Sequence, residues 1–585
     1  MSLPTDSNPD FFKSKVLGHP SGLFVLFFTE MWERFSFYGM RALLVLFLTS
    51  TVADGGWDWS REQAMALFGS YVGLVYLSTM LGGYFADNII GYRLAVVVGA
   101  ALMTLGHASM AAETPFFTYL GLILLVFGNG FFKPNMTSIL SEIYKDHPEK
   151  KDGAYTIFYM GVNSGSFFGI LLCGYLGEQV GWSLGFGLAG IFMFFGLVQF
   201  WLSQDIFGNI GLKPKKATAG VIETVEDEDR RNPFTTGQMV LIGIMVTLGL
   251  LWIIFEPVKI ISGGAVDIFN FSLLGLSGNN FTILLAVILF LVLLFIRIPK
   301  YSRVTRDRMI AVTFFAFVAA FFWAIFEQAP GTLTIFARDY TNRILEGNAG
   351  LIFKLANASL TLIPLGIITW VLLKLFGQTF KHYPFANVIL GFSFVIVWGI
   401  AIWMLKNQFA QEALEVPASW FSTLNSLFVI SLAPLFTKLW DSKLNPPANY
   451  KYGLGMLLLS IGAACIAFGA GSIEVGARTA SVSMIWLILV YLFFTMGELC
   501  ISPVGLSYVS KLVPARMIAV MFGIWYLAIA IGMKAAAKFG ESIDRVADEK
   551  GISYFFWMLA SVAFGAAVLA VITRPAIKKL MHGVR

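Results

Sequence analysis

The apolar segment 23–48 contains the stretch Glu30-Met31-Trp32-Glu33-Arg34-Phe35-Ser36-Phe37-Tyr38-Gly39-Met40-Arg41. In a helix, residues three or four apart are neighbours, so four charged side chains and one tyrosine lie on or near one face: Glu30, Glu33, Arg34, Tyr38 and Arg41. A lone charge at the centre of a bilayer costs ~2.5–3.5 kcal/mol, and such groups persist only where they face water or a partner inside a bundle. The stretch therefore predicts an internal polar pathway, and its mixed sign favours proton and charge movement over anchoring.

The composition is that of a polytopic α-helical membrane protein. Of 585 residues, 57% are hydrophobic and 13% charged, and the mean hydropathy is +0.74. The net charge of +6 does not indicate a nucleic-acid partner, because the basic residues fall in alternate loops, as membrane topology requires. The cysteines Cys173, Cys465 and Cys500 all lie in apolar segments, with no disulfide framework and no zinc spacing. We expect neither a metal nor a cofactor.

Long apolar segments recur from end to end, and we predict sixteen membrane spans from them. Their limits are about 23–48, 63–86, 94–112, 117–141, 154–177, 183–204, 238–256, 281–297, 309–337, 351–374, 386–405, 417–439, 452–472, 482–510, 515–536 and 551–573. Fourteen spans is the alternative, because the two pairs between the halves are the weakest members. Basic loops such as 145–151 and 297–308 place the N-terminus in the cytoplasm, and the even count places the C-terminus there too.

The pattern of spans and polar segments divides the chain into five parts. Residues 1–205 form a six-helix bundle, and residues 206–305 form a cytoplasmic linker with two extra helices. Residues 306–340 are the first helix of a second bundle, residues 341–415 an inserted helical hairpin, and residues 416–585 the rest of the second bundle. The two helices of the linker read as lipid-facing or packing helices, with Glu256 at the end of one.

Several spans carry charged residues at depth, and their signs differ between the halves. Lys133 in the first half opposes Glu498 in the second, and Arg41 opposes Glu327. Charges placed in this way can bridge the two halves, and breaking the bridges is a plausible switch between two states. The uncharged candidates are open to a simpler interpretation. Tyr71, Tyr76 and Trp525 can be packing aromatics, and Asn163 and Asn425 can hydrogen-bond helix to helix.

The motifs together resemble those of the proton-dependent oligopeptide transporters, a branch of the major facilitator superfamily. The resemblance begins with Glu30-x-x-Glu33-Arg34-Phe35-x-x-Tyr38-Gly39 and spans nearly the whole chain, in order. The other motifs are Gly83-x-x-x-Asp87 … Gly91-x-Arg93, Phe131-Phe132-Lys133-Pro134-Asn135, Phe158-Tyr159-x-x-x-Asn163-x-Gly165-Ser166, Phe326-Glu327-Gln328 and Gly497-Glu498-Leu499-Cys500-Ile501-Ser502-Pro503. The resemblance implies the major facilitator fold, with two six-helix bundles and an extra helical pair at 238–297 of the kind that bacterial members carry. The second extra pair, in 341–415, departs from the family pattern, because only a short loop is expected there; a packing or partner-docking hairpin is the interpretation.

The resemblance also implies a role for each matching residue. Arg34, Lys133 and Tyr38 would bind the carboxylate of a peptide, and Glu498 with Asn163 and Asn425 would bind its ammonium group. Aromatic side chains would line the pockets for the peptide's own side chains, and Ser502 follows Glu498 in the same motif. These aromatic residues are Tyr76, Tyr159, Trp323, Phe326 and Trp525. Glu30 and Glu33, paired with Arg34 and Lys133, would couple protons, and Glu327 with Arg41 would act both as a gate and as a titrating, proton-coupling pair.

The function that follows is proton-coupled symport of di- and tripeptides across a bacterial inner membrane by alternating access. The partners are the peptide, protons and the lipid bilayer; a monomer suffices, and the proton is the coupling ion in place of a cofactor. The sequence departs from the family pattern at Phe37, where a second tyrosine is common, and at Gly69, where animal members carry a coupling histidine. Another small solute, such as nitrate, an amino acid or a drug-like acid, remains an alternative, as does a channel. No sequence motif of a membrane enzyme is present.

Overall fold

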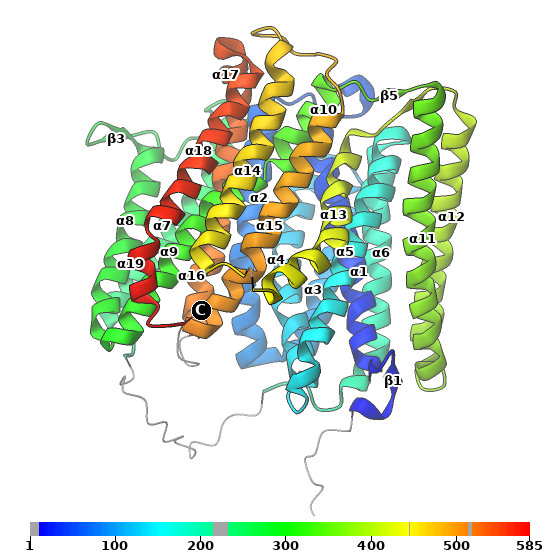
Figure 1. The fold of residues 1–585 in the computed structure, drawn as a ribbon, viewed down its shortest axis with the longest axis horizontal. Helices are drawn as coiled ribbons and strands as arrows, with labels where there is room; N and C mark the ends of the chain where they lie inside the picture. The colour runs from blue at the N-terminus through cyan, green and yellow to red at the C-terminus, as the bar shows by residue number, and fades with distance from the viewer. Residues whose placement is uncertain (1–10, 215–231, 444, 513–517, 585) are drawn as a thin grey trace, which may run out of the picture.

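The computed structural model describes residues 11–214, 232–443, 445–512 and 518–584, and most of them are helical (Figure 1). The acidic part of the predicted linker, in 215–231, lies outside the described residues, as do the first residues of the predicted span 515–536 and the side chain of Pro503.

Six helices of the first third of the chain form one bundle, which we call the N-bundle. They are α1 (Ser21–Thr49), α2 (Arg61–Phe85), α3 (Tyr92–Met110), α4 (Pro115–Ile143), α5 (Pro148–Gln179) and α6 (Trp182–Ser203). Local signals set several of the helix starts. Ser60 and Gln63 form a capping box at α2, and Pro115 and Pro148 occupy the first turns of α4 and α5, where no amide donor is needed.

The second bundle, the C-bundle, is built from the later helices. They are α9 (Arg303–Phe326), α10 (Thr334–Tyr340), α13 (Thr423–Asp441), α14 (Ala448–Gly469), α15 (Ile485–Leu512), α16 (Ile518–Glu541), α17 (Ile543–Lys550), α18 (Ile552–Ile572) and α19 (Arg574–Leu580). A π-helical turn, η6 (Ala329–Leu333), joins α9 to α10, and a 3₁₀ turn, η7 (Ala418–Ser422), precedes α13.

Two helical pairs lie outside the bundles. The first is α7 (Thr236–Ile261) with α8 (Gly278–Arg297), and the second is α11 (Gly347–Thr379) with α12 (Pro384–Ala410). The strands are two residues long and pair as antiparallel hairpins: β1 (Lys15–Val16) with β2 (His19–Pro20), β3 (Ser272–Leu273) with β4 (Leu276–Ser277), and β5 (Ile344–Leu345) with β6 (Leu414–Glu415).

Each of the sixteen predicted spans coincides with a helix. Fourteen helices of the described residues are long and apolar enough to cross a membrane. The helices α1 and α16 complete the sixteen. The first is not among the fourteen because every 18-residue window in it holds at least three charged residues. The predicted span 309–337 is α9, η6 and α10 together.

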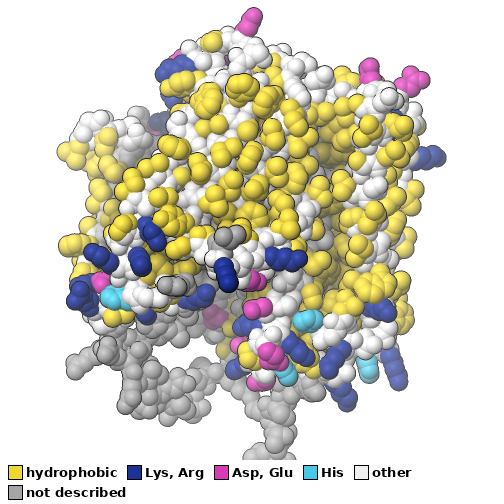
Figure 2. All heavy atoms as spheres, in the orientation of Figure 1, with side chains coloured by type: hydrophobic (Ala, Val, Ile, Leu, Met, Phe, Trp, Pro, Cys, Tyr) yellow, Lys and Arg dark blue, Asp and Glu magenta, His cyan; other side chains and the backbone are white. Residues whose placement is uncertain are grey.

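The first and last described elements lie at one end of the molecule and α10 and α17 at the other, and we call these the β1 end and the α10 end (Figure 1). Hydrophobic side chains cover the middle of the face shown in Figure 2, and lysine and arginine side chains gather near the β1 end. This banding is typical of a protein that crosses a bilayer.

Glycines at helical spacing bring α1 and α5 together. A Cβ atom added at Gly161 would meet the ring of Phe27, and one added at Gly165 or Gly169 would meet the backbone carbonyl of Met31 or Phe35. Small residues four apart on one helix let the backbones of neighbouring helices approach closely. This close packing fixes the position of α1, and with it the charged face of that helix.

The hairpin of α11 and α12 follows the C-bundle helix α10 in the chain, but it packs on the N-bundle, beside α6 (Figure 1). The ring of Phe394 lies 5.5 Å from that of Trp32 on α1, and the ring of Phe392 lies 5.9 Å from that of Phe195 on α6. Strands β5 and β6 close the base of the hairpin at the α10 end. The inserted segment therefore follows α10 of the C-bundle in the chain but packs its two helices on the N-bundle.

Candidate functional site

The charged face of α1 forms a buried cluster around Arg34. The Arg34 Nε lies 2.9 Å from Glu30 Oε1 and 2.5 Å from Glu33 Oε2. Asn129 of α4 donates a hydrogen bond of 2.9 Å to Glu33 Oε1. The Glu33 side chain is 0% exposed and that of Arg34 4% exposed. One base is thus shared between two acids from its own helix.

Arg34 has binding capacity left over. Its Nη2 atom is buried and has no hydrogen-bond partner among the residues that the structure describes. Its guanidinium lies 5.5 Å from the centroid of the Phe37 ring, the aromatic residue that stands where a second tyrosine was expected. A buried guanidinium nitrogen with no partner is a site for an anionic ligand, because leaving such a donor unpaired is costly.

A second positive charge comes from α4. Lys133 is half-buried, and its Nζ stands 4.3 Å above the ring centroid of Tyr76 on α2. It acts electrostatically on Glu30 and on Glu33. Tyr38 lies in the fields of both Arg34 and Glu498. The structure therefore brings the predicted carboxylate-binding residues into one region of the N-bundle, facing the C-bundle.

The C-bundle contributes the opposite charge. Glu498 of α15 accepts a hydrogen bond of 3.0 Å from the amide of Asn425 on α13, which also donates to Thr495 Oγ1 at 3.1 Å. The Glu498 charge acts on Tyr38 of α1 and on Tyr159 of α5. Arg34 of the N-bundle and Glu498 of the C-bundle thus both lie near Tyr38.

Two other predicted substrate-binding residues, Asn163 and Ser502, form no bond to Glu498. The Asn163 amide donates to the carbonyl of Tyr159, one turn earlier in α5, at 2.9 Å, and the structure gives it no bond to Glu498. Ser502 is half-buried, and its hydroxyl has no partner among the described residues. Asn425 is therefore hydrogen-bonded to Glu498 without a ligand, and the role of Asn163 in holding the ammonium group stays a prediction.

Three of the five predicted aromatic residues, Trp323, Phe326 and Trp525, belong to the C-bundle, whereas Tyr76 and Tyr159 belong to the N-bundle. The rings of Trp323 and Phe326 meet edge to face at 5.6 Å, and Phe326 lies 6.1 Å from Phe494. Trp525 is buried against α15, where a side chain at Gly505 would collide with its indole. Trp323 and Phe326 are half-buried, whereas Trp525 packs inside the bundle.

Arg41 of α1 and Glu327 at the end of α9 form the predicted ion pair between the bundles. Both side chains are nearly fully buried, and the Arg41 guanidinium lies 5.6 Å from the ring centroid of Phe68 and 5.8 Å from that of Phe37. Two contacts of the site were missed: the Asn129 bond to Glu33, and a hydrogen bond of 2.9 Å between Ser166 of α5 and Ser426 of α13. Glu33 belongs to the motif of α1, and Asn129 precedes the motif that begins at Phe131. Only the fold brings these two residues together.

Comparison with known proteins identifies the family. The family model described as "PTR2: POT family" matches residues 93–225 and 391–558. The peptide transporter YePEPT of Yersinia enterocolitica is 32% identical over 574 residues, covering 97% of this chain and 96% of that protein. The chain belongs to the POT family. A di-/tripeptide transporter of Lactococcus lactis subsp. cremoris is another POT-like relative, 29% identical over 97% of this chain and 98% of its own length.

Solved POT-family structures have the same fold. A point mutant of a peptide transporter POT in complex with alafosfalin superposes with a TM-score of 0.70 at 28% identity, covering 98% of each chain. A peptide transporter POT in complex with sulfate gives the same TM-score at 27% identity, over 99% of this chain and 100% of that one. The predicted major facilitator fold is confirmed.

Polar contacts close the α10 end of this POT-family chain. Arg61, at the start of α2, pairs with Asp339 at 2.7 Å and with Asp544 at 2.8 Å. Further contacts join α1 and α5 to the C-bundle, between Arg338 and Thr49 and between Glu178 and Ser419. The two bundles are therefore held together above the charged site, at the end where α10 and α17 lie.

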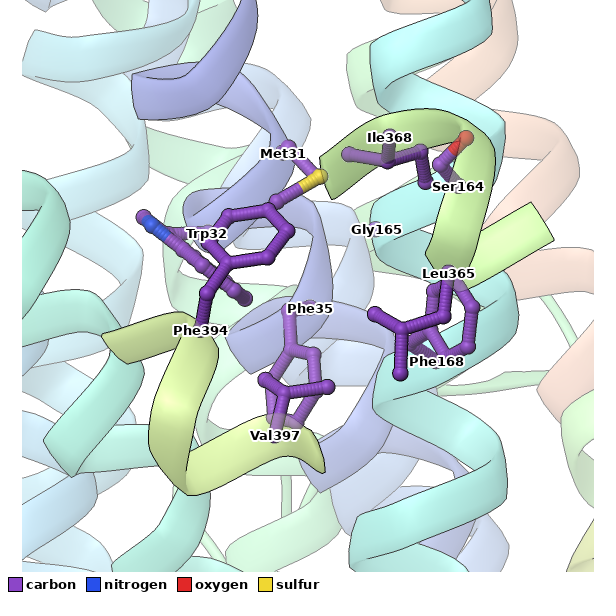
Figure 3. Close-up of a pocket in the computed structure, with 10 residues that line it drawn as sticks. All are labelled: Met31, Trp32, Phe35, Ser164, Gly165, Phe168, Leu365, Ile368, Phe394 and Val397. Carbon is purple, nitrogen blue, oxygen red and sulfur yellow. The ribbon is translucent and has the colours of Figure 1, made fainter. Parts of the chain in front are cut away.

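A small apolar pocket lies on another side of α1, between α1, α5 and the hairpin of α11 and α12 (Figure 3). Its lining is Met31, Trp32, Phe35, Ser164, Gly165, Phe168, Leu365, Ile368, Phe394 and Val397. Only Ser164 contributes a polar side chain, and no charged residue of the site borders it. The pocket is a packing gap of the hairpin and not part of the charged site.

Proposed function

We propose that the chain is a proton-coupled symporter of di- and tripeptides that works by alternating access between the N-bundle and the C-bundle. The proton serves as the coupling ion, no further cofactor takes part, and one chain is sufficient. The observation that carries the proposal is the arrangement of Arg34 and Lys133 on one bundle and Glu498 on the other, with Tyr38 near both Arg34 and Glu498.

This arrangement suits a short zwitterion. A peptide has an anionic and a cationic end separated by one or two residues, and charge pairs are strong in a site shielded from water. The unpartnered Arg34 Nη2 and the Lys133 ammonium would hold the carboxylate, while Glu498, kept in place by Asn425, would hold the ammonium. Recognition of the two ends leaves the peptide's side chains to Trp323 and its aromatic neighbours, which supports broad specificity.

Proton coupling follows from competition for Arg34. Without peptide, Glu30 and Glu33 both hold the Arg34 guanidinium. A proton on one carboxylate weakens that contact and leaves Arg34 available to the peptide carboxylate. The Arg41–Glu327 pair would act as the gate between the bundles. Release of the peptide and of the proton on the same side returns Arg34 to its own acids.

The chain sits in the membrane with the β1 end, where the first and last described elements lie, in the cytoplasm of a bacterial cell. The gathering of lysine and arginine near that end supports this orientation (Figure 2), and the bacterial relatives support the inner membrane. Because the α10 end is closed by the Arg61 contacts, the described state faces inward. Tyr159, which lies nearer the β1 end of α5, is 43% exposed.

Uptake into proteoliposomes tests the proposal. Labelled Ala-Ala should accumulate only with the lumen more alkaline than the bath, and unlabelled tripeptides should compete, whereas nitrate and free alanine should not. Competition by nitrate or alanine instead of tripeptides would assign another cargo. Uptake that neither saturates nor responds to the pH gradient would indicate a channel, and either result overturns the proposal.

A further inference from the structure

A buried ion-pair cluster lies outside the site described above. Lys534 of α16 donates hydrogen bonds of 2.8 Å to Glu256 Oε2 of α7 and to Ser70 Oγ of α2. The side chains of Lys534 and Glu256 are 3% and 2% exposed. Lys538, one turn later in α16, pairs with Glu256 as well and with Glu541 at 2.6 Å. The cluster joins three parts of the fold: the N-bundle, the C-bundle and the helical pair of α7 and α8.

The α7 helix is otherwise exposed, which makes its carboxylate unusual. Only 11% of its most apolar window is buried, as expected of a helix that faces lipid. Its few buried residues are Gln238, Ile253, Glu256 and Pro257. The exposure of α7 and its packing on α2 agree with the expected lipid-facing or packing helix, but Glu256 in addition presents a charge to the bundles. Charges inside a membrane are costly and mark functional pathways.

The two partners of this ion pair belong to parts that move apart in alternating access. Helix α7 packs on α2: a side chain at Gly73 would meet Ile253, and Gln63 donates to the carbonyl of Ile261. Glu256 is therefore carried with the N-bundle. Lys534 is carried with the C-bundle, to which α16 belongs: α16 packs on α9 and also forms a contact between the bundles, with α2. Opening the α10 end separates α2 from α16, and this separation pulls Lys534 away from Glu256 and Ser70.

The pair lies at about the depth of the Arg41–Glu327 pair. Lys534 is seven residues from the end of α16 and Arg41 eight residues from the end of α1, and both helices end toward α10. At 1.5 Å per residue, both charges stand roughly 10–12 Å from the helix ends. We propose that Glu256 and Lys534 are further gating residues, a second buried ion pair that holds the α10 end closed and makes α7 part of the transport machinery.

This proposal rests on the alternating access of the proposed function but not on the cargo, so its test measures opening directly. Spin labels would be placed at Val180, after α5, and at Val475, before α15, which are 50% and 61% exposed at the α10 end. The background carries Cys465→Ser, because Cys173 and Cys500 are buried. Double electron–electron resonance in proteoliposomes then gives the ratio of open to closed populations, with no peptide needed.

Glu256→Gln leaves the Lys534 ammonium without its acid in the closed state only. We expect the open-to-closed ratio to rise at least tenfold, which corresponds to about 1.4 kcal/mol. Lys259→Met is the matched control, because the 2.7 Å pair of Lys259 with Asp267 lies within the α7–α8 pair and joins no bundle. This control should leave the ratio unchanged.

The double variant Glu256→Gln/Lys534→Met keeps the test valid if the single variant fails to fold, because it buries no unpaired charge. Its open-to-closed ratio should lie between those of the wild type and Glu256→Gln. A lower thermal stability with an unchanged ratio in both variants would show that the pair only packs α7 in place. That result, or an equal shift with Lys259→Met, overturns the proposal.

Discussion

Replacing Glu33 by glutamine separates proton coupling from peptide movement. Glu33 is fully buried and has two partners, Arg34 Nε at 2.5 Å and the Asn129 amide at 2.9 Å. Glutamine has nearly the same shape and keeps an oxygen for Asn129, but it carries no charge and takes up no proton. Arg34 keeps its 2.9 Å contact with Glu30, so the guanidinium is not left unpaired.

The expected sizes follow from these contacts. Losing one hydrogen bond between charged groups lowers the free energy of unfolding by about 1.5–3 kcal/mol, so Glu33→Gln should still fold. One pH unit of gradient supplies about 1.4 kcal/mol per proton, which is a tenfold accumulation of peptide for each proton moved with it. In Glu33→Gln the accumulation ratio should fall to one, while counterflow exchange stays within about threefold of wild type, since exchange needs no net proton movement.

The assay is uptake of labelled Ala-Ala into proteoliposomes, run once with an inward acid gradient and once as counterflow with unlabelled peptide inside. Glu412→Gln, in an exposed loop at the α10 end, is the matched control and should accumulate like wild type. Gradient-driven accumulation by Glu33→Gln at the wild-type ratio would refute the reasoning. The reasoning would also be refuted if Glu33→Gln lost both counterflow exchange and accumulation, because the residue would then serve binding or folding and not coupling.

Three further perturbations probe other parts of the structure. Glu327→Gln removes the carboxylate partner of the buried Arg41, so gradient-driven uptake should fall at least tenfold; wild-type uptake would exclude the gate. Replacing 346–413 by Asn-Gly should join β5 to β6 through a two-residue turn. This variant should keep peptide uptake within a few-fold of wild type and should have a lower melting temperature. Loss of uptake in a well-folded sample would show that the hairpin has a direct role in transport. Gly165→Leu should abolish a monodisperse peak in size-exclusion chromatography, because its side chain would enter the backbone of α1, whereas Gly366→Leu, with open space around it, should not.

The sequence predicted the helices and the charged face of α1 well, because both depend on local patterns. Span length and hydropathy locate a helix, and the cost of burying charge shows that Glu33 and Arg34 must find partners. The pairing of Arg41 with Glu327 and of Asn425 with Glu498 was predicted through the family motifs, and the structure brings both pairs together.

Contacts between distant segments that no family motif marks were the part that the sequence did not predict. Glu256 and Lys534 are far apart in the chain, and only the packing of α7 on α2 brings them together. A lysine inside an apolar span was the available signal. The docking of the hairpin on α6 had no local signal, because apolar faces look alike whether they meet lipid or protein. The Asn163 amide donates a hydrogen bond within its own helix. The spacing of residues in the sequence cannot distinguish such a bond from one to another helix.

The central claim is that groups of opposite charge on the two bundles hold the two ends of one peptide. The most direct measurement compares the binding affinities of wild type, Lys133→Gln and Glu498→Gln for three ligands: Ala-Ala, its C-terminal amide and its N-acetyl form. Each variant should weaken Ala-Ala binding by about 10- to 150-fold, the value of one lost charge-assisted bond of about 1.5–3 kcal/mol. The loss from Lys133→Gln should vanish with the amide, and the loss from Glu498→Gln should vanish with the N-acetyl form. Losses that stay the same for all three ligands would contradict the account.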